Sequence, residues 1–217
     1  MASDLPPAAE WAQWPASLEE MPLSRKQIES AAQTSETAVV FLGRAMGESM
    51  DNQAKHGYFY LTDAEKDLLD HVSTVFSKTA VVIDAGSILD MSWADDPKIG
   101  AILYAFQGGM ESGNALADVL YGDVNPSGRL TDTVARCYED YPASGNFGAA
   151  DYNVYREDIY VGYRYFETFA RNRVLYPFGF GLSYTRFALK TCYALEDGEC
   201  VLRTAVTNTG SFPGKEV

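Results

Sequence analysis

Three short apolar runs constrain the fold of this chain more than any other feature of its sequence. They are TAVVFLG (37–43), TAVVIDAG (79–86) and IGAILYAF (99–106). Each run is continuous and rich in β-branched residues, a pattern typical of strands that are covered on both faces in a parallel sheet. We therefore expect strands at 37–42, 79–84 and 99–105, adjacent or nearly adjacent in a sheet of about five or six strands.

Helices are predicted between and after these runs. The capping-box patterns Ser24-x-x-Gln27 and Thr62-x-x-Glu65 each begin a helix, and SGNALADVLYG predicts a further helix that Gly122 ends. Apolar residues follow the second capping box at helical spacing, namely Leu68, Leu69, Val72, Val75 and Phe76. Strands that alternate with helices favour an α/β fold, a mostly parallel sheet sandwiched between helices with right-handed crossovers.

The C-terminal third has a different texture. A Pro/Gly turn, VNPSGRL, is followed by a long tyrosine-rich segment of the kind that wraps a scaffold or shapes a site. From Arg186 the sequences RFALKTCYAL and CVLRTAVTNTG flank a turn at EDGE, which predicts an antiparallel hairpin outside the parallel sheet. Its apolar face should be exposed. Because the chain stops where another strand should begin, we expect this β segment to be incomplete.

Composition narrows the possible partners. The net charge is -13 and the calculated pI is near 4.5, so the chain should repel nucleic acid and anionic membrane surfaces. The first residues lack a basic stretch followed by an apolar one, and no segment holds the roughly 18 apolar residues of a membrane span. We therefore expect a soluble, cytoplasmic protein with no nucleic-acid or membrane partner.

The cysteines and histidines give little support to metal or redox chemistry. The three cysteines, Cys137, Cys192 and Cys200, form no C-x-x-C pair, and their odd number argues against a disulfide framework. Buried, reduced thiols are the favoured interpretation, and a Cys192–Cys200 bridge is the alternative. We expect no metal site. The absence of a dinucleotide or P-loop motif also predicts no cofactor, and without a G-x-S-x-G elbow a Ser-His-Asp hydrolase fits poorly.

The segment FLGRAMGESMDNQ leads from the first strand into a loop that carries Glu48. Ligands of open α/β sheets gather beyond the carboxyl ends of strands, which makes Glu48 a candidate for proton transfer. From position alone a solvated loop carboxylate is the favoured interpretation. Asp51 and Asn52 are either polar contacts to a sugar or turn formers, and from position alone the role in a turn is somewhat favoured.

Several longer stretches give a sharper signal. GRAMGESMDN, VVIDAGSILDMSW, GNALADVLYGDVNPSGRL, YVGYRYFETF and YPFGFGLSYTRF occur in this order. Together they resemble the second domain of glycoside hydrolase family 3 over about residues 37–187. The closing TNTGSFPGKEV looks like the opening of the fibronectin-type-III-like domain that many members carry. The expected division is a linker or arm at 1–22, the α/β-sandwich domain at 23–187 and an incomplete fibronectin-like segment at 188–217.

The resemblance implies a retaining β-glycosidase of the β-glucosidase type that hydrolyses terminal β-linked sugars. A separate (β/α)₈-barrel domain of the same polypeptide holds the aspartate nucleophile in this family, and the loop glutamate of the sandwich domain is the general acid/base. MGES places Glu48 at that glutamate. Because they lie close to Glu48 in the sequence, Asp51 and Asn52 are our candidate substrate contacts. The chain alone should then be inactive. The alternative is a non-catalytic carbohydrate-binding or scaffold module of the same fold.

Aromatic residues and glycines near the end of the resemblance have two interpretations. The aromatics could stack on sugar rings, although packing between a sheet and a wrapping segment is favoured; they are Tyr163, Tyr165, Phe166, Tyr176, Phe178, Phe180 and Tyr184. Gly179 and Gly181 in PFGFG predict positive φ angles or a close backbone approach, a structural role.

Overall fold

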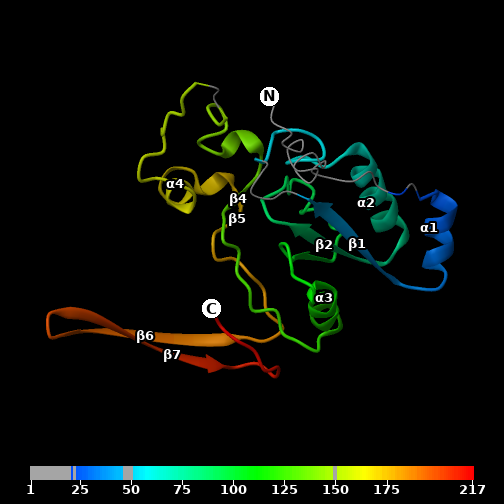
Figure 1. Cartoon of the computed structure of the whole chain (residues 1–217). Helices are drawn as coiled ribbons and strands as arrows, with labels where there is room; N and C mark the ends of the chain where they lie inside the picture. Colours follow the sequence, from blue (N-terminus) through cyan, green and yellow to red (C-terminus); the bar gives the residue numbers. More distant parts are fainter. Residues whose placement is uncertain (1–20, 22, 46–50, 149–150) are drawn as a thin grey trace, which may run out of the picture. The chain divides into compact units, whose positions relative to one another are not determined.

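The structure is a computed structural model that describes residues 21, 23–45, 51–148 and 151–217 (Figure 1). The chain forms two compact units, and each unit is built from two separate segments. The first unit consists of Met1–Gly109 and Val134–Leu175, and the second of Met110–Thr133 and Tyr176–Val217.

The first unit contains the parallel sheet that the apolar runs predict. Its strands are β1 (Thr37–Arg44), β2 (Lys78–Ala85) and β3 (Ala101–Tyr104), in the order β1-β2-β3. β1 pairs with β2 from Thr37↔Lys78 to Arg44↔Ala85, and both pairings are parallel. The predicted strands and their adjacency are confirmed. Among the described residues this sheet has three strands, fewer than the five or six that we expected.

The central and edge strands differ in how they are covered. In β2, Val81, Val82 and Ile83 are all fully buried, so both faces of the strand are packed, as predicted. In β1, alternate residues such as Leu42 are buried, whereas Phe41 is 53% exposed. The expectation that both faces of this first run are covered is therefore wrong for β1. Exposed and buried residues alternate along β1, so one face of the strand is packed and the face that carries Val39 and Phe41 is open among the described residues.

Two helices accompany the sheet in the first unit (Figure 1). α1 (Arg25–Ala32) packs on α2 (Asp63–Val75), and α2 contacts β1 and β2. Both helices begin at the predicted capping boxes, because Ser24 and Thr62 accept hydrogen bonds from the backbone N–H three residues on. Leu69 and Val72 of α2 are buried, which confirms the apolar face read from the sequence.

The tyrosine-rich segment forms a small core of its own within the first unit. β4 (Val134–Ala135) pairs with β5 (Val174–Tyr176), and α4 (Tyr163–Phe169) lies between them in sequence. Two 3₁₀ turns, Tyr138–Asp140 and Arg171–Arg173, join these elements. The buried cluster consists of Ala135, Phe166 and Ala170, with Tyr141, Tyr165 and Val174 packed against it.

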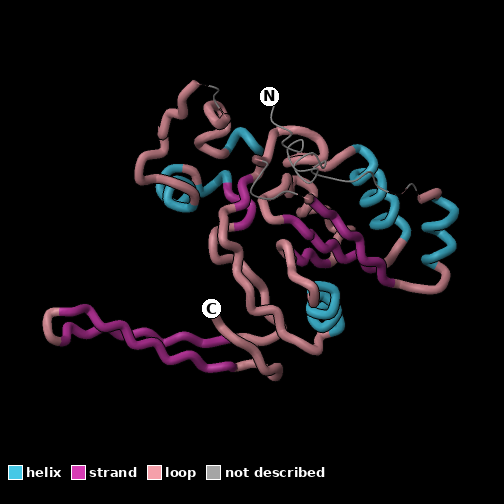
Figure 2. Tube along the Cα trace, in the orientation of Figure 1, coloured by secondary structure: helices cyan, strands magenta, loops and turns pink. Residues whose placement is uncertain are grey.

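The second unit contains the predicted hairpin and the helix before it (Figure 2). α3 (Ser112–Tyr121) ends at Gly122, as predicted, and this glycine has a left-handed φ of +83°. β6 (Phe187–Glu196) pairs antiparallel with β7 (Glu199–Asn208), and Figure 2 shows the two strands side by side in a long hairpin. Asp197 and Gly198, with φ of +52° and +84°, make the tight turn between them. Large side chains on the hairpin are exposed, including Tyr193 and Leu195.

The glycine-rich blocks of the second unit lie against each other. The Leu130 N–H donates to Phe180 O, and the Gly179 N–H donates to Leu130 O. Gly179 has a φ of +79°, and a Cβ on Gly181 would lie 2.6 Å from Gly128 O. The structural role predicted for both glycines is therefore confirmed, because one needs a positive φ and the other a close backbone approach.

The three cysteine residues are free and exposed, so the expectation of buried thiols is wrong. Cys192 pairs across the hairpin with Arg203, and Cys200 with Leu195, so the alternative Cys192–Cys200 bridge is not formed. Exposure follows from position, because the hairpin strands that carry two of the thiols are largely uncovered. In the parts of the chain that the structure describes, no helix has the length and apolarity to span a membrane.

Candidate functional site

Polar groups from several segments lie at the carboxyl ends of the parallel strands, which we call the carboxyl edge of the sheet. β1 ends at Arg44, β2 ends at Ala85, and Gln107 follows three residues after the end of β3. Because the strands are parallel, all three chain exits lie at the same edge (Figure 1). Ligands of open α/β sheets bind at such an edge, which makes it the first candidate site.

Arg44 fixes the last residue of β1 through its buried side chain. The guanidinium is 0% exposed and makes a two-pronged pair with Glu65 at the start of α2, with N–O distances of 2.5 and 2.8 Å. Its Nε also donates to Tyr58 O at 2.9 Å, and Nη2 donates to Tyr60 O at 3.4 Å. A buried arginine is tolerated only when its donors are matched in this way.

Glu65 uses its carboxylate twice. Besides the Arg44 guanidinium, it accepts a hydrogen bond from the backbone N–H of Thr62 at 2.8 Å, which completes the capping box of α2. The same carboxylate therefore joins the end of β1 to the beginning of α2. The sequence showed the capping box, but it gave no sign of the partner 21 residues earlier.

Gln107 reaches the backbone at the end of β1 from the far strand of the sheet. Its Nε2 donates to Arg44 O at 3.0 Å. The residue before it, Phe106, has a φ of +56°, a left-handed conformation that non-glycine residues rarely adopt. The Phe106 ring lies 4.9 Å from that of Tyr104, whose hydroxyl donates to Ser87 O. Sequence reasoning missed both Gln107 and Phe106.

Glu48, the predicted acid/base, lies outside the described residues, as does the rest of 46–50. Asp51, on the C-terminal side of this segment, is exposed. The amide of Asn52 donates through Nδ2 to Ile88 O at 2.8 Å, which ties the chain to the loop after β2. Asn52 Oδ1 is buried and accepts no hydrogen bond from the described residues. The Nδ2 contact gives Asn52 a structural role, and the sugar contacts of Asp51 and Asn52 both stay predictions.

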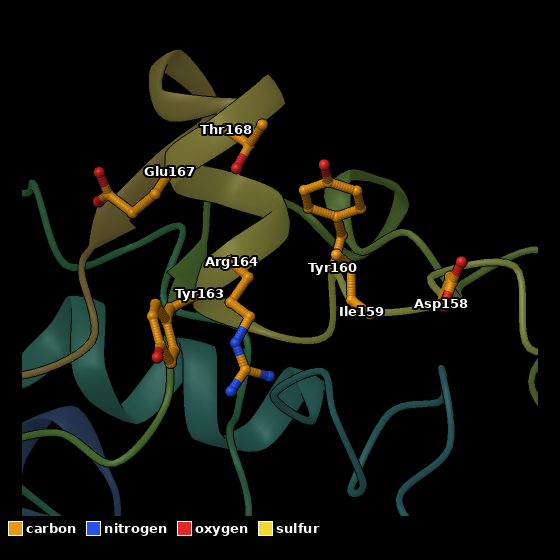
Figure 3. Close-up of a pocket in the computed structure, with 7 residues that line it drawn as sticks. All are labelled: Asp158, Ile159, Tyr160, Tyr163, Arg164, Glu167 and Thr168. Atoms are coloured by element: carbon orange, nitrogen blue, oxygen red, sulfur yellow. The ribbon is translucent and has the colours of Figure 1, made fainter.

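A hollow lies beside α4 and has a volume of about 600 Å³. Figure 3 shows Tyr163, Arg164, Glu167 and Thr168 on the helix, and Tyr160 and Asp158 on the segment before it. The Arg164 guanidinium carbon lies 5.5 Å from the centre of the Tyr163 ring, and the Tyr160 and Phe169 rings are 4.8 Å apart, edge to face. The hollow therefore presents aromatic rings beside charged groups.

Exposure separates the aromatics for which we expected packing. Phe166 is buried and Tyr165 packs against the same cluster, as expected. In contrast, Tyr163 is 40% exposed and Tyr184 is 46% exposed, and Phe178 and Phe180 are exposed as well. The expectation of core packing is wrong for these four residues. For Tyr163 the reason is that a single residue of the short helix α4, Phe166, is buried.

No group of three or more potential metal ligands occurs in the described part of the chain. The described polar groups at the carboxyl edge of the sheet include carboxylates, amides and one buried guanidinium. This set suits neutral, hydroxyl-rich ligands, which are bound by hydrogen bonds to carboxylate and amide groups.

Comparison with known proteins gives a consistent result. Residues 16–184 match the sequence model described as the glycosyl hydrolase family 3 C-terminal domain. A β-glucosidase of Ruminococcus albus is 45% identical over 207 residues, which is 95% of this chain and 22% of that protein. β-Glucosidase A of Butyrivibrio fibrisolvens is 40% identical over 94% of this chain and 30% of its own length.

Solved structures agree with the sequence relatives. A β-glucosidase from Paenibacillus barengoltzii superposes with a TM-score of 0.90 at 46% identity, over 94% of this chain and 23% of that one. β-Glucosidase 3B from Thermotoga neapolitana, in complex with glucose, gives a TM-score of 0.79 at 40% identity over 87% of this chain and 27% of that one. The chain therefore spans between a fifth and a third of the length of these relatives.

Proposed function

The chain belongs to the family of glycosyl hydrolase family 3 C-terminal domains, and from that premise we propose that it is the part of a retaining β-glucosidase that supplies the general acid/base. The reaction is hydrolysis of terminal β-linked sugars. Glu48 is the proton donor and acceptor, and an aspartate on a (β/α)₈-barrel domain of the same polypeptide is the nucleophile. The main support is the family match across residues 16–184, within which Glu48 follows the end of β1.

The division of labour follows from the chemistry of retention. A retaining glycosidase needs two carboxyl groups about 5–5.5 Å apart, one to attack the anomeric carbon and one to protonate the leaving oxygen. Glu48 begins protonated, gives its proton to the leaving group, and then removes a proton from the water that releases the sugar. Asp51, which is exposed beside this segment, accepts a hydrogen bond from a sugar hydroxyl.

This division predicts that the 217-residue chain alone does not hydrolyse aryl β-glucosides. A proton donor without an opposing nucleophile cannot form the glycosyl–enzyme intermediate, and most of the rate enhancement is lost. Turnover by the purified chain that a mechanism-based glucosidase inhibitor abolishes would contradict it.

The remaining parts of the chain have roles in the same proposal. Residues 1–22 are a linker or arm, 23–187 the α/β-sandwich domain, and 188–217 the opening of a fibronectin-type-III-like domain. The exposed hairpin β6–β7 supports the last assignment, because an isolated pair of strands with uncovered apolar residues needs further strands to bury them.

The decisive experiment is Glu48→Gln in the complete enzyme. The change keeps the shape of the side chain and removes its proton, so a substrate with a poor leaving group should react about 10²-fold more slowly. An activated aryl glucoside needs little protonation and should lose much less in its glycosylation step. Azide should restore the release of the sugar, because it attacks without a general base.

The matched control is Glu36→Gln, which makes the same change at an exposed residue just before β1. It should leave both rates unaltered. Equal losses on the two substrates in Glu48→Gln, without azide rescue, would remove Glu48 from the mechanism and make Asp51 the next residue to test.

A non-catalytic carbohydrate-binding module is the second candidate function. The observation that favours it is the hollow beside α4, where Tyr160, Tyr163 and Arg164 could hold a pyranose ring by stacking and hydrogen bonds (Figure 3). Calorimetric titration of the chain with glucose and cellobiose tests it. Binding that Tyr163→Ala abolishes, in a protein without glucosidase activity in its complete form, would favour this function over catalysis.

A further inference from the structure

The carboxyl edge of the sheet contains an arrangement that the proposed reaction steps do not use. Two side chains from other elements contact Arg44, the last residue of β1. Glu65 comes from the first turn of α2, and Gln107 comes from the segment after β3. The side chain of Arg44 donates to Glu65 and to the backbone carbonyls of Gly43, Tyr58 and Tyr60, and its own carbonyl accepts a hydrogen bond from Gln107. The last residue before the loop that carries Glu48 is thus fixed from two sides.

We propose that Arg44 and Gln107 are positioning residues for the acid/base: they set the place and direction in which the chain leaves β1 toward Glu48. The inference rests on the proposed function, because it assigns these residues a task only if Glu48 transfers the proton. Neither residue is proposed to touch the sugar or the reacting atoms.

The position of Gln107 explains why a side chain is needed there. The β1–β2 ladder ends with the pair Arg44↔Ala85, so the carbonyl of Arg44 lies where regular strand pairing stops. Gln107 supplies an N–H donor to this carbonyl from the segment after β3. An unpaired carbonyl at the end of a strand is free to rotate with its peptide plane, whereas a hydrogen-bonded one is fixed.

The backbone before Gln107 supports a positioning role. Phe106 has a left-handed φ of +56°, a backbone conformation that residues other than glycine rarely adopt. Such strain persists where the surrounding structure over-determines it, and it gathers at functional sites. The ring contact with Tyr104 and the hydrogen bond from Ala105 N to Ile83 O hold the chain before the turn, and the Gln107 side chain holds it after the turn. The strained turn places Gln107 within reach of β1.

The burial of Arg44 separates positioning from simple stabilisation. A capping box needs only Thr62 and Glu65, and an apolar side chain at position 44 could fill the buried site at the end of β1. A buried guanidinium that donates to one carboxylate and three backbone carbonyls fixes direction as well as distance, because its donors lie in one plane in a rigid arrangement.

Gln107→Met in the complete enzyme tests the proposal. Methionine has nearly the same length but no donor, and Gln107 is exposed, so the melting temperature should not change. We expect kcat for a substrate with a poor leaving group to fall about 10-fold, since a misplacement of about 1 Å can cost 10²-fold. The rate of glycosylation by an activated aryl glucoside should stay within about twofold, as proton transfer contributes little there. KM should change little.

Rescue and control variants separate positioning from a structural role. Gln107→Lys keeps an N–H donor of similar reach and should restore most of the lost rate. Gln33→Met makes the same exchange at an exposed residue after α1 and should change neither rate. Equal losses on both substrates, no loss at all, or no recovery in Gln107→Lys would each overturn the proposal.

The double variant Glu48→Gln/Gln107→Met separates the positioning role of Gln107 from the proposed function of Glu48. If Gln107 acts through Glu48, the second change should add almost nothing once the acid is gone. If Glu48→Gln itself shows no dependence on the leaving group, the proposed function fails. If Glu48→Gln shows that dependence and Gln107→Met does not, the positioning role alone is wrong. Arg44→Lys should show the same leaving-group dependence where it folds.

Discussion

Two arginine–glutamate pairs, one in each unit, have nearly the same geometry and opposite surroundings. Arg44 and Glu65 in the α/β unit bond at 2.5 and 2.8 Å with side chains 0% and 2% exposed. Arg203 and Glu196 on the hairpin bond at 2.6 and 2.8 Å with side chains 57% and 46% exposed. The same bidentate arginine–glutamate pair therefore occurs once in a buried site and once on an exposed hairpin.

The difference lies in what each pair joins. Arg44 and Glu65 are 21 residues apart and connect a strand to a helix, so their contact exists only in the folded unit. Arg203 and Glu196 are seven residues apart across a two-residue turn, and the strands they join would meet without them. The α/β unit depends on tertiary packing, whereas the hairpin depends on its turn and its backbone ladder.

The largest difference in stability between the two pairs is expected when their glutamates are removed, beginning with Glu65→Ala. Removal of Glu65 leaves the Arg44 guanidinium buried without its counter-ion, which typically costs about 3–5 kcal/mol. The free energy of unfolding, measured by urea denaturation with circular dichroism, should fall by this amount or the unit should fail to fold. Glu196→Ala, the matched change on the hairpin, should produce no measurable loss because solvent replaces the glutamate. Equal losses of unfolding free energy in the two variants would contradict the different roles of the buried and the exposed pair.

A smaller contrast is expected between buried and exposed apolar residues. Ile83 is fully buried in β2, so Ile83→Ala should lower the free energy of unfolding by about 2–5 kcal/mol through lost burial and the cavity left behind. Leu195 is 77% exposed, so Leu195→Ala should change it little. Urea denaturation of both variants provides the test. A large loss in Leu195→Ala would mean that the hairpin is covered in solution.

A local change at the turn should affect the hairpin alone. Gly198 has a φ of +84°, and a side chain there costs about 1–2 kcal/mol. Gly198→Ala should therefore speed hydrogen exchange of the β6 and β7 amides and leave the amides of β2 protected. Gly145→Ala, at an exposed glycine without a positive φ or a close neighbour, is the control. Faster exchange in both units would show that the hairpin supports the α/β unit.

The smallest effect is electrostatic. The guanidinium of Arg203 lowers the pKa of Glu196 below its ordinary value. A lowered pKa in the folded state means that the stabilisation is present above the unfolded pKa and is lost as the pH falls through the folded one. NMR titration of the Glu196 carboxyl should give a midpoint below about 4.3, and Arg203→Ala should return it toward that value. An unchanged midpoint in Arg203→Ala would exclude the pair in solution.

Local patterns explain why much of this fold could be predicted from sequence. The capping boxes at Ser24 and Thr62, the helix end at Gly122 and the hairpin turn at EDGE each depend on residues within a few positions of one another. The three apolar runs likewise indicated the parallel strands. They did not show that β1 is an edge strand, because TAVVFLG and TAVVIDAG read almost alike and only the sheet order distinguishes them.

The candidate site was less predictable because its contacts join residues that are far apart in the sequence. The resemblance to glycoside hydrolase family 3 pointed to Glu48, a single residue in a recognisable block, and that assignment stays a prediction. Arg44, Gln107 and Phe106 act through partners on other strands, and nothing in their neighbouring residues identifies those partners. A charged residue at the end of a buried strand was the one available signal for Arg44.

The interleaving of the two units has a consequence for how the protein is made and modified. The chain enters the second unit at Met110, returns to the first at Val134 and leaves it again at Leu175. On the ribosome, the α/β unit can be completed only after α3 of the other unit has been synthesised, because Phe166 comes later than α3. No contiguous stretch of the gene encodes either unit, so recombination could exchange neither of them with a single crossover.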